Sequence, residues 1–306
     1  MVMSSTHMSV DRIPEYPEFR KVSIEDKARI DTLFDRFPNE VSERTFASVY
    51  AWRNYATRSR LSMFEGHLLI SWRRERYGDL LLPPAGPEPT AIMSKLSSMK
   101  PQGFNGFFCL TGPTVAELRR EGLEPESLRD EWDYVYRRQD LAQLAGPAYH
   151  TQRKEVKKAT SQYQLSFEPM TAEHRDASLL LEELWCDLKS CSADRLSSAE
   201  DAALKESLLE FGPLGLVGGV VLIEGRIQAL TLGERLNTNT AVVHFEKANP
   251  GIRGLYPFIN QQFCEKVLSS YEFVNREQDV GEPGLRRAKE GYHPHHFVEK
   301  HLLRIA

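Results

Sequence analysis

The stretch Val220-Val-Leu-Ile-Glu-Gly-Arg-Ile-Gln-Ala-Leu230 contains two apolar runs on either side of Glu224-Gly225. Apolar, β-branched residues around a two-residue turn that contains glycine are typical of a β-hairpin. A third strand-like run follows at Thr240–Phe245, so residues 220–245 predict a meander of three strands. We take this meander as the centre of the predicted fold.

An equivalent hairpin lies in the first half of the chain, where Leu61-Ser-Met-Phe-Glu-Gly-His-Leu-Leu-Ile70 turns on Glu65-Gly66. A short strand and a helix start precede each hairpin: Phe19–Val22 with Ser23-Ile-Glu-Asp26, and Leu165–Phe167 with Thr171 as N-cap. Each following helix has an apolar stripe, formed by Ile30, Leu33, Phe34 and Phe37 in the first half and by Leu181, Leu184, Trp185 and Leu188 in the second.

Each half then continues with a third strand (Asp79–Leu82; Thr240–Phe245), a helix, another strand (Gly106–Leu110; Tyr271–Asn275), a short helix and a closing strand (Trp132–Arg137; Phe297–Arg304). This order predicts a mixed α/β (α+β) fold with a partly parallel sheet. It resembles the GNAT acyltransferase fold, here in two tandem domains. We expect a disordered lead-in over residues 1–10, an N-terminal domain over 11–145 and a C-terminal domain with the active site over 146–306.

Composition excludes several classes of protein. The 306 residues are 41% hydrophobic and 27% charged, and the net charge of −4 argues against a general nucleic-acid coat protein while leaving room for a local basic face. No apolar run reaches the roughly 18 residues needed to cross a bilayer, and no signal peptide is visible, so we expect a cytoplasmic protein without a transmembrane segment. The cysteines lack C-x-x-C spacing and are expected to be reduced thiols: Cys109, Cys186, Cys191 and Cys264.

The segment Phe273–Pro294 carries the densest group of polar side chains. It begins as a short strand, turns through Gly281 and Gly284, and enters a short cationic helix. Polar side chains at the end of a strand, before a glycine turn, are how many α/β folds present active-site groups. The alternative is a solvated loop with surface salt bridges. The side chains in question are Asn275, Arg276, Glu277, Asp279, Arg286, Arg287 and Lys289.

A second candidate site is the loop in Phe245–Asn260, which follows the third strand and opens a helix. In an acetyltransferase, N–H groups at such a helix start bind the pyrophosphate of coenzyme A. The usual loop reads (Gln/Arg)-x-x-Gly-x-(Gly/Ala), whereas the glycines here are Gly251 and Gly254. The position therefore fits a donor site, the coenzyme A pattern is absent, and a simple helix entry is the alternative.

A third feature is the basic stretch at residues 146–158. If it is helical, its basic side chains share one face and are candidates for contact with RNA or another phosphate. The alternative is a solvated helix face. These side chains are His150, Arg153, Lys154, Lys157 and Lys158.

No metal site or hydrolase nucleophile is predicted. The spacing of His293, His295 and His296 fits neither helical ligation nor a zinc pattern, and the cysteines are remote in sequence. No Gly-x-Ser-x-Gly motif occurs.

Together these motifs resemble the DUF2156 family, which is related to the C-terminal catalytic domain of phosphatidylglycerol lysyltransferases. The family pattern Asn-Arg-Glu-Gln-Asp-Leu-Gly-x-x-Gly-Leu-Arg-x-x-Lys-x-Ser-Tyr-x-Pro is matched by Asn275, Arg276, Glu277, Gln278, Asp279, Gly281, Gly284, Leu285, Arg286, Lys289, Tyr292 and Pro294. Other similar positions are Glu246, Lys247, Asn249, Gly254, Tyr256 and Asn260, then Tyr149, His150 and Arg153, and then Phe46, Tyr50, Trp52 and Arg53. The chain departs from the family at Gly291, where the family has Ser, and in a less basic linker at Pro147, Ala148, Thr151 and Gln152.

The resemblance implies an enzyme that moves an acyl or aminoacyl group to an amine or hydroxyl acceptor. Glu277 or Asp279 is expected to be the catalytic base. The expected substrate-binding residues are Asn275, Arg276, Arg286, Lys289, Tyr292, Glu246 and Lys247. The expected donor-binding residues are Asn249, Gly251, Gly254, Tyr256 and Asn260, and the candidate RNA or phosphate contacts are His150, Arg153, Lys154 and Lys157.

No tightly bound cofactor is expected, and the acyl donor is aminoacyl-tRNA or acyl-CoA. The degenerate glycines favour aminoacyl-tRNA, because such a donor does not need the pyrophosphate loop. The acceptor is a small molecule, a peptide or a lipid headgroup. Two alternatives remain: an acetyl-CoA-dependent N-acetyltransferase and a non-catalytic ligand-binding protein.

Overall fold

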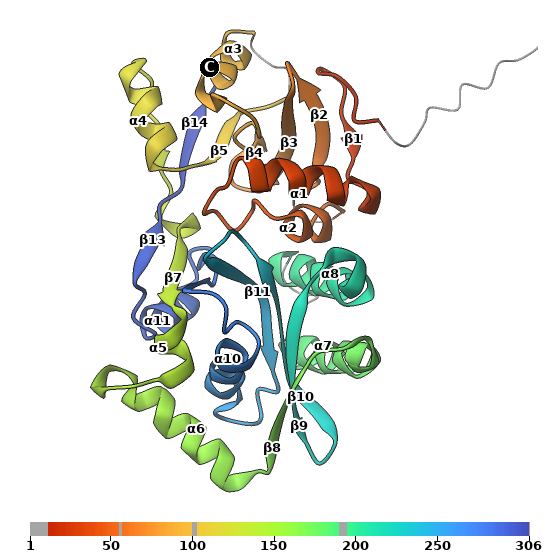
Figure 1. Ribbon diagram of the computed structural model, residues 1–306, viewed down its shortest axis with the longest axis vertical. Coiled ribbons are helices and arrows are strands. Elements are labelled where there is room, and N and C mark those ends of the chain that lie inside the picture. Colours follow the sequence, from red (N-terminus) through yellow and green to blue (C-terminus); the bar gives the residue numbers. More distant parts are fainter. Residues whose placement is uncertain (1–11, 55–56, 100–102, 190–194, 306) are drawn as a thin grey trace, which may run out of the picture.

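The computed structural model describes residues 12–54, 57–99, 103–189 and 195–305. They form two α/β units, each built on a mixed seven-stranded sheet, which are stacked along the long axis of the molecule (Figure 1). The predicted fold class, with two tandem units, is confirmed. The predicted lead-in over residues 1–10 lies outside the described residues, as does Cys191.

The first sheet has the strand order β1-β2-β3-β4-β5-β14-β6. Helices α1 and α2 pack on one face, while α3 and α4 pack on the other. The strands are β1 (Arg20–Lys21), β2 (Arg60–Phe64), β3 (His67–Arg74), β4 (Gly78–Leu81), β5 (Gly106–Leu110), β6 (Glu126–Ser127) and β14 (His301–Arg304). The helices are α1 (Lys27–Arg36), α2 (Phe46–Ala51), α3 (Pro89–Ser98) and α4 (Gly112–Arg120).

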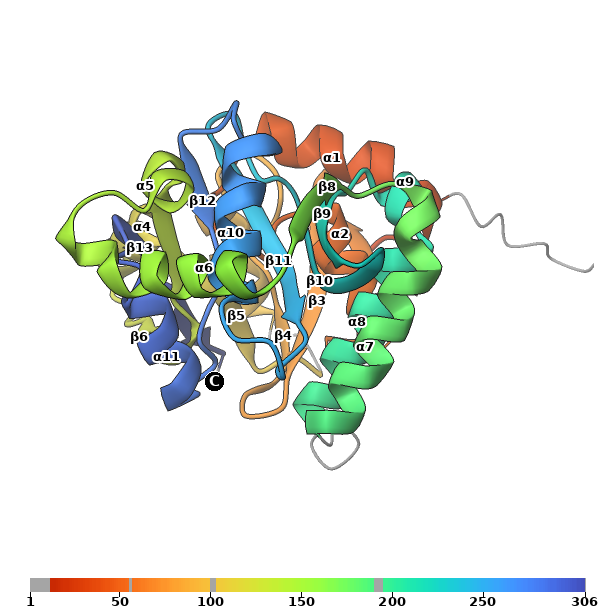
Figure 2. The same cartoon turned by 90° about the horizontal axis from the view of Figure 1, so that it is seen from below.

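The second sheet has the order β13-β7-β12-β11-β10-β9-β8. Helices α5, α6 and α10 lie on one face, and α7 and α8 lie on the other (Figure 2). The strands are β7 (Asp133–Arg137), β8 (Leu165–Pro169), β9 (Val217–Ile223), β10 (Arg226–Arg235), β11 (Thr240–Ala248), β12 (Phe273–Asn275) and β13 (His296–Val298). The helices are α5 (Arg138–Gln143), α6 (His150–Gln162), α7 (Arg175–Lys189), α8 (Arg195–Leu209), α9 (Phe211–Leu214), α10 (Leu255–Lys266) and α11 (Pro283–Glu290).

Both predicted hairpins are confirmed, and their turns explain why the two sequences are alike. Strand β2 pairs with β3, and β9 pairs with β10, in each case across a Glu-Gly turn. The φ angles are 48° and 79° at Glu65 and Gly66, and 50° and 74° at Glu224 and Gly225. Positive φ at both central residues is the geometry of a type I′ turn, whose twist matches that of the flanking strands.

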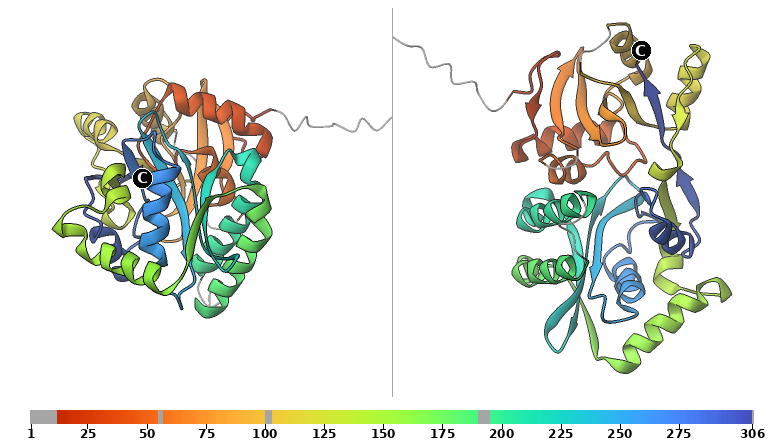
Figure 3. Two further views of the ribbon diagram at one scale, coloured as in Figure 1. Left: turned by 60° about the horizontal axis from the view of Figure 1, so that its bottom comes forward. Right: turned by 180° about the vertical axis from the view of Figure 1, so that it is seen from behind.

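Each sheet contains one strand from the other half of the chain. Strand β7 pairs with β12 and β13 in the second sheet, and β14 pairs with β5 and β6 in the first (Figure 3). The closing strand predicted over Phe297–Arg304 is therefore wrong as a single element, because it is two short strands in different sheets. An apolar run in the sequence indicates a strand, but its partner depends on long-range packing.

Two irregularities in the second sheet position the side chains of the candidate site. Strand β11 pairs with β10 at Leu232–Phe245 and at Gly233–Val243, so His244 is an extra residue that forms a β-bulge. The parallel pairing of β11 with β12 ends at Val242 and Asn275, although β11 continues to Ala248. Polar side chains lie where these two strands separate.

One apolar cluster joins the two units. It contains buried residues of α1 and α2 together with residues of α8, β9 and β10. At the interface the ring of Trp52 stacks on the ring of Phe245, with centroids 6.2 Å apart. The two units therefore share one continuous core instead of meeting through a polar linker. None of the helices in the described residues is long and apolar enough to span a membrane.

The helix predicted around Leu181 exists as α7, but its apolar stripe is only partly buried. Leu181 is 4% exposed, whereas Leu184 is 45% exposed and Leu188 is 57% exposed. The predicted stripe therefore lies on a helix, and of its three leucines Leu181 is the buried one. Only the first half of the stripe packs against the core.

The cysteines also differ from expectation. Cys109 and Cys264 are free and buried, as predicted. Cys186 is disulfide-bonded, so the prediction of four reduced thiols is wrong at this position. The absence of C-x-x-C spacing did not reveal this bond, because disulfide pairing depends on the distance between two cysteines in the folded chain.

Candidate active site

The bulge on β11 places His244 between two carboxylates. His244 Nδ1 lies 2.7 Å from Glu277 Oε1, and His244 Nε2 lies 2.9 Å from Glu234 Oε1. Because both ring nitrogens donate to carboxylates, His244 is an imidazolium. Burial lowers the pKa of His244, but the hydrogen bonds to Glu234 and Glu277 outweigh it and raise this pKa to about 10. The result is a buried cation held by two anions.

Glu277, the first predicted catalytic base, is held by its backbone as well as by His244. Its φ is 56°, in the left-handed region that few non-glycine residues adopt, and its N–H donates to Asn275 Oδ1 at 2.8 Å. Its Oε1 is occupied by His244, whereas its Oε2 has no hydrogen-bond partner among the described residues. The side chain is 22% exposed, so one carboxylate oxygen is left for a substrate proton.

The His244 cluster predicts a specific dependence of stability on pH. The folded-state pKa of about 10 lies above the ordinary value of 6.5, so this contribution is fully present below pH 6.5 and disappears as the pH rises through 10. We expect a loss on the order of 4 kcal/mol in the unfolding free energy over that window. Urea denaturation of the wild type and of His244→Gln at a series of pH values measures it.

Lys289 acts in the opposite direction, because burial lowers its pKa to about 8 and stability from that group rises between pH 8 and 10.5. The comparison with His244→Gln removes this background. His150→Gln, which changes an exposed histidine on α6, should retain the wild-type slope. An identical pH slope in wild type and His244→Gln would contradict the ion-paired geometry.

Glu246, Asn260 and Arg276 form a second group, which the chain connects to Glu277 through Arg276. Arg276 Nη2 lies 3.0 Å from Glu246 Oε1, and Asn260 Nδ2 lies 3.4 Å from Glu246 Oε2. Arg276 Nη1 and Asn260 Oδ1 are buried without a hydrogen-bond partner among the described residues. The Tyr292 ring lies under the guanidinium, with its centroid 4.9 Å from Arg276 Cζ. Unpaired buried polar atoms are costly, so an unpaired donor and an unpaired acceptor on the two partners of Glu246 indicate a binding position.

Asp279, the second predicted base, lies in a different environment. Its oxygens accept bonds from Arg286 at 2.8 Å, from Tyr134 Oη at 2.6 Å and from Gly281 N at 2.9 Å. Burial raises the pKa of Asp279, but these bonds outweigh it and lower the pKa to about 2. Asp279 is fully buried. This geometry favours a structural role for Asp279 and for its partner Arg286, which also pairs with Asp130 at 2.8 Å.

Lys289 and Asn275 likewise build the loop that carries Glu277. Lys289 Nζ donates to the carbonyl oxygens of Arg276 at 2.7 Å and Gln278 at 2.5 Å. The Asn275 side chain is fully buried and donates to Asp133 Oδ2 at 3.0 Å. The segment 275–294 therefore divides into groups that face the binding position and groups that shape the loop.

In the predicted donor loop, backbone N–H groups are hydrogen-bonded to other atoms of the loop. The N–H of Gly251 donates to Asn249 Oδ1 at 2.9 Å, and Ile252 N donates to Asn249 O at 3.1 Å. Gly254 has a φ of 92°, and a Cβ at this position would lie 2.4 Å from Glu155 O, so α6 packs directly on the start of α10. Tyr256 Oη accepts from Trp185 Nε1 at 3.2 Å. Of the five predicted donor residues, Asn260 is the one that contacts Glu246.

The basic stretch forms helix α6, as the spacing predicted. Its side chains line a groove of about 520 Å³ together with residues of α10 and the end of α5. His150, Lys154 and Lys157 are exposed there. Arg153 is different, because its guanidinium donates to Leu144 O and to Gly146 O and so caps the end of α5. The groove is lined by Leu144, His150, Arg153, Lys154, Val156, Lys157, Thr160 and Gln261.

The chain also matches a known protein family. The model of a family described as "Phosphatidylglycerol lysyltransferase, C-terminal" matches residues 34–304. The chain belongs to this family. The family resemblance inferred from the 275–294 motif is confirmed. No curated protein sequence matches the chain.

Solved structures show the same fold. A conserved protein of unknown function from Bacteroides thetaiotaomicron is 26% identical, with a TM-score of 0.86 over 94% of this chain and 99% of that one. The C-terminal DUF2156 domain of a putative lysylphosphatidylglycerol synthetase from Agrobacterium fabrum is 14% identical, with a TM-score of 0.66 over 93% of each chain. A tandem GNAT protein from the clavulanic acid biosynthesis pathway is 11% identical, with a TM-score of 0.50 over 94% of this chain and 98% of that one.

In this family member, Lys247 lies away from Glu277. Successive side chains of a strand point to opposite faces, so Glu246 faces α10 and Lys247 faces α7 and α8. Lys247 Nζ is 2.9 Å from Glu200 Oε2 and 3.6 Å from the centroid of the Trp185 ring. The side chain is 3% exposed. Lys247, expected to bind substrate, is thus paired inside the protein on the other face of the sheet.

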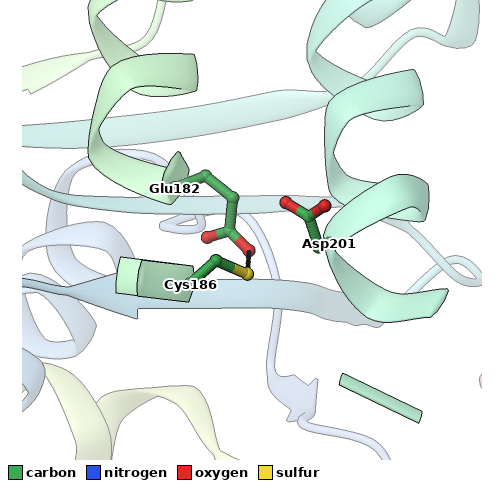
Figure 4. Close-up of side chains that lie close together, drawn as sticks. All are labelled: Glu182, Cys186 and Asp201. Carbon is green, nitrogen blue, oxygen red and sulfur yellow. Dashed lines mark hydrogen bonds between the residues drawn. The ribbon is translucent and has the colours of Figure 1, made fainter. Parts of the chain in front are cut away.

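Glu182 and Cys186 of α7 and Asp201 of α8 lie close together on this face of the sheet (Figure 4). Each offers a ligand atom within 4.8 Å of the others. The donor set does not fit a metal ion, because Cys186 is disulfide-bonded and offers no thiolate. Lys247 Nζ lies 4.0 Å from Glu182 Oε1 and already supplies a cation. Burial raises the pKa of Glu182 to about 7.

Sequence reasoning missed His244 and Glu234. His244 lies inside an apolar strand and Glu234 at the end of another, so neither stands in a polar cluster along the chain. A histidine within a buried strand is the only signal that the sequence contained. The bulge that aims His244 at Glu277 depends on the pairing of β10 with β11.

Proposed function

We propose that this protein transfers an aminoacyl group from aminoacyl-tRNA to an amine or hydroxyl acceptor. The observation that carries the proposal is the group formed by Glu246, Asn260 and Arg276. The carboxylate of Glu246 and the unpaired Oδ1 of Asn260 can both accept hydrogen bonds from an α-ammonium group. The unpaired Nη1 of Arg276 can donate to the carbonyl oxygen of the same aminoacyl ester. Glu246 already pairs with Arg276, and a simple acyl group has no ammonium group to donate to Glu246 or to Asn260 Oδ1.

The donor loop supports the same choice. A coenzyme A pyrophosphate binds to free N–H groups at a helix start. Here Asn249 accepts from the N–H groups of Gly251 and Ile252, and α6 covers the start of α10 at Gly254. These N–H groups are thus already hydrogen-bonded within the loop. An aminoacyl-tRNA donor has no pyrophosphate that would require them.

In the proposed reaction, Glu277 is the general base. Its Oε2 takes the proton from the acceptor as the acceptor oxygen or nitrogen forms a bond to the ester carbonyl carbon. The ester C–O bond of the donor then breaks, and the proton passes from Glu277 to the departing ribose oxygen. His244 orients the Glu277 carboxylate through the contact at Oε1, and Arg276 stabilises the negative charge that develops on the carbonyl oxygen.

The groove along α6 is the proposed contact for the tRNA backbone. His150, Lys154 and Lys157 are exposed there and form no ion pair within the described residues. Binding through such cations weakens steeply as salt concentration rises. The overall net charge of −4 makes this local basic face the more distinctive.

Thermal denaturation with three ligands tests the proposal, because a ligand that binds the folded state raises the melting temperature. We expect the largest rise with aminoacyl-tRNA, a smaller one with the same tRNA uncharged, and none with acetyl-CoA. The double variant Lys154→Glu/Lys157→Glu should lose most of the rise with either tRNA. Lys21→Glu, at an exposed lysine on the edge of the first sheet, is the matched control.

A rise with acetyl-CoA alone would replace the proposed donor by coenzyme A chemistry. No rise with any of the three ligands would favour a non-catalytic binding protein. Equal rises with charged and uncharged tRNA would show that Glu246, Asn260 and Arg276 do not recognise the aminoacyl group.

A further inference from the structure

We propose that Asn275 is a positioning residue through which the N-terminal unit holds Glu277 against His244. The inference rests on the proposed function only in giving Glu277 a chemical role. The contacts themselves form an unbroken series of hydrogen bonds across the interface of the two units.

The first part of the series is a buried network around Asp133, at the start of β7. Lys300 lies between β13 and β14, where the chain passes from one sheet to the other, and its Nζ is 2.7 Å from Asp133 Oδ1 and 2.6 Å from Glu43 Oε2. Ser42 N donates to Asp133 Oδ2 at 2.8 Å. Asp133 and Lys300 are fully buried, and Ser42 and Glu43 are almost so. Ser42 and Glu43 come from the N-terminal unit.

The second part is the amide of Asn275, whose orientation is determined by its neighbours. Its Nδ2 donates to Asp133 Oδ2 at 3.0 Å and to Glu40 O at 3.1 Å, and both partners are acceptors. The amide oxygen must therefore point the other way, where it accepts from Glu277 N at 2.8 Å. Glu277 Oε1 then meets His244 Nδ1 at 2.7 Å.

Gln278 provides a parallel connection. In the amide orientation that satisfies both neighbours, its nitrogen donates to Asp133 Oδ1 at 3.2 Å and its oxygen accepts from Arg74 Nη2 at 3.1 Å. Arg74 belongs to β3 and pairs with Glu43 at 3.2 Å. Residues on both sides of Glu277 are thus attached to the N-terminal unit.

The attachment explains how Glu277 keeps an unfavourable backbone conformation. A φ of 56° is a strained value for a residue other than glycine, and it persists only where the surroundings enforce it. The second sheet alone lacks Glu40, Ser42 and Glu43, so it lacks part of what enforces the loop. The N-terminal unit therefore serves the candidate site without contributing a reacting group.

The test is the pKa of His244, measured by NMR titration of its ring protons in the whole protein. Asn275→Ser retains a hydroxyl near Glu277 N but is too short to reach Asp133. We expect the pKa of His244 to fall by at least about one unit, a tenfold change in proton affinity, towards the value found in Glu277→Gln. Asn275→Ala removes all three side-chain hydrogen bonds and should shift the pKa of His244 at least as far.

Asn249→Ser is the matched control. Asn249 also accepts from the N–H two residues ahead, but its Nδ2 donates to Gln228 on β10 instead of to the interface. The pKa of His244 should be unchanged in this variant. If either variant, Asn275→Ser or Asn275→Ala, is folded and has the same His244 pKa as the wild type, the proposal is overturned. A result from one folded variant is sufficient.

The same measurement separates this inference from the proposed function. A fallen His244 pKa together with no aminoacyl transfer in the wild type would leave the positioning role intact and reject the reaction. If transfer occurs, Asn275→Ser should lower kcat more than it raises KM, because the donor contacts at Glu246 and Arg276 do not pass through Asn275.

Discussion

Replacing Lys300 by methionine will lower the free energy of unfolding by about 3 to 5 kcal/mol. Although burial lowers the pKa of Lys300, Asp133 and Glu43 raise it above its ordinary value, so the ammonium is charged in the folded protein. Methionine fills a similar volume but leaves the buried Asp133 without a cation and Glu43 with Arg74 alone. Equilibrium unfolding in urea measures the loss, and adding Glu43→Gln to Lys300→Met should recover part of it.

Arg304→Met is the control for this prediction. Arg304 lies on β14, four residues further along, and pairs with Glu126 at 3.3 Å. Both side chains are more than half exposed, so removing this pair should change stability by no more than about 1 kcal/mol. Equal losses in the two variants would contradict the idea that burial makes the Lys300 network important.

In the proposed reaction, we expect Glu277→Gln to reduce the rate of aminoacyl transfer by about 10²- to 10⁴-fold while the protein stays folded. Glutamine keeps an oxygen that accepts from His244, but it has no basic oxygen to take the proton of the acceptor. Single-turnover loss of the labelled aminoacyl group from charged tRNA, measured with a lipid and small-amine acceptor mixture, gives the rate. Full activity in this variant would remove Glu277 from the proposed mechanism.

Glu234→Gln is the matched variant on the other side of the same imidazolium. Glu234 accepts from His244 Nε2, whereas Glu277 accepts from the other ring nitrogen, Nδ1. Its replacement alters the charge on His244 without removing the base, so we expect a loss of about tenfold or less. Asp279→Asn should chiefly reduce stability, because Asp279 is occupied by Arg286, Tyr134 and Gly281.

Features that depend on neighbouring residues could be predicted from the sequence. The two Glu-Gly hairpins, the capping box of Ser23 with Asp26 and the basic helix α6 all occur where they were expected. Each depends on backbone angles or side-chain bonds within a few positions. The motif in 275–294 also identified the family, because its spacing is specific.

The same motif could not reveal which of its side chains keep polar atoms that are free of protein partners among the described residues. Asn275, Asp279, Arg286 and Lys289 are as polar as Glu277 and Arg276, yet they bond to the protein itself. Lys247 stands next to Glu246 in sequence and lies on the opposite face of the sheet. Side chains alternate between the two faces of β11, and different helices cover those faces. This arrangement places Lys247 and Glu246 in different surroundings.

By itself, the sequence determined the order of strands and helices, the tight turns and the family, since all of these follow from residues close together along the chain. Tertiary structure alone decided the exchange of β7 and β14 between sheets, the bulge that brings His244 to Glu277, and the interface network that supports Asn275. The physical reason is that those contacts join residues from about 10 to more than 200 positions apart, where pairing depends on how two surfaces bury together and not on local backbone preference.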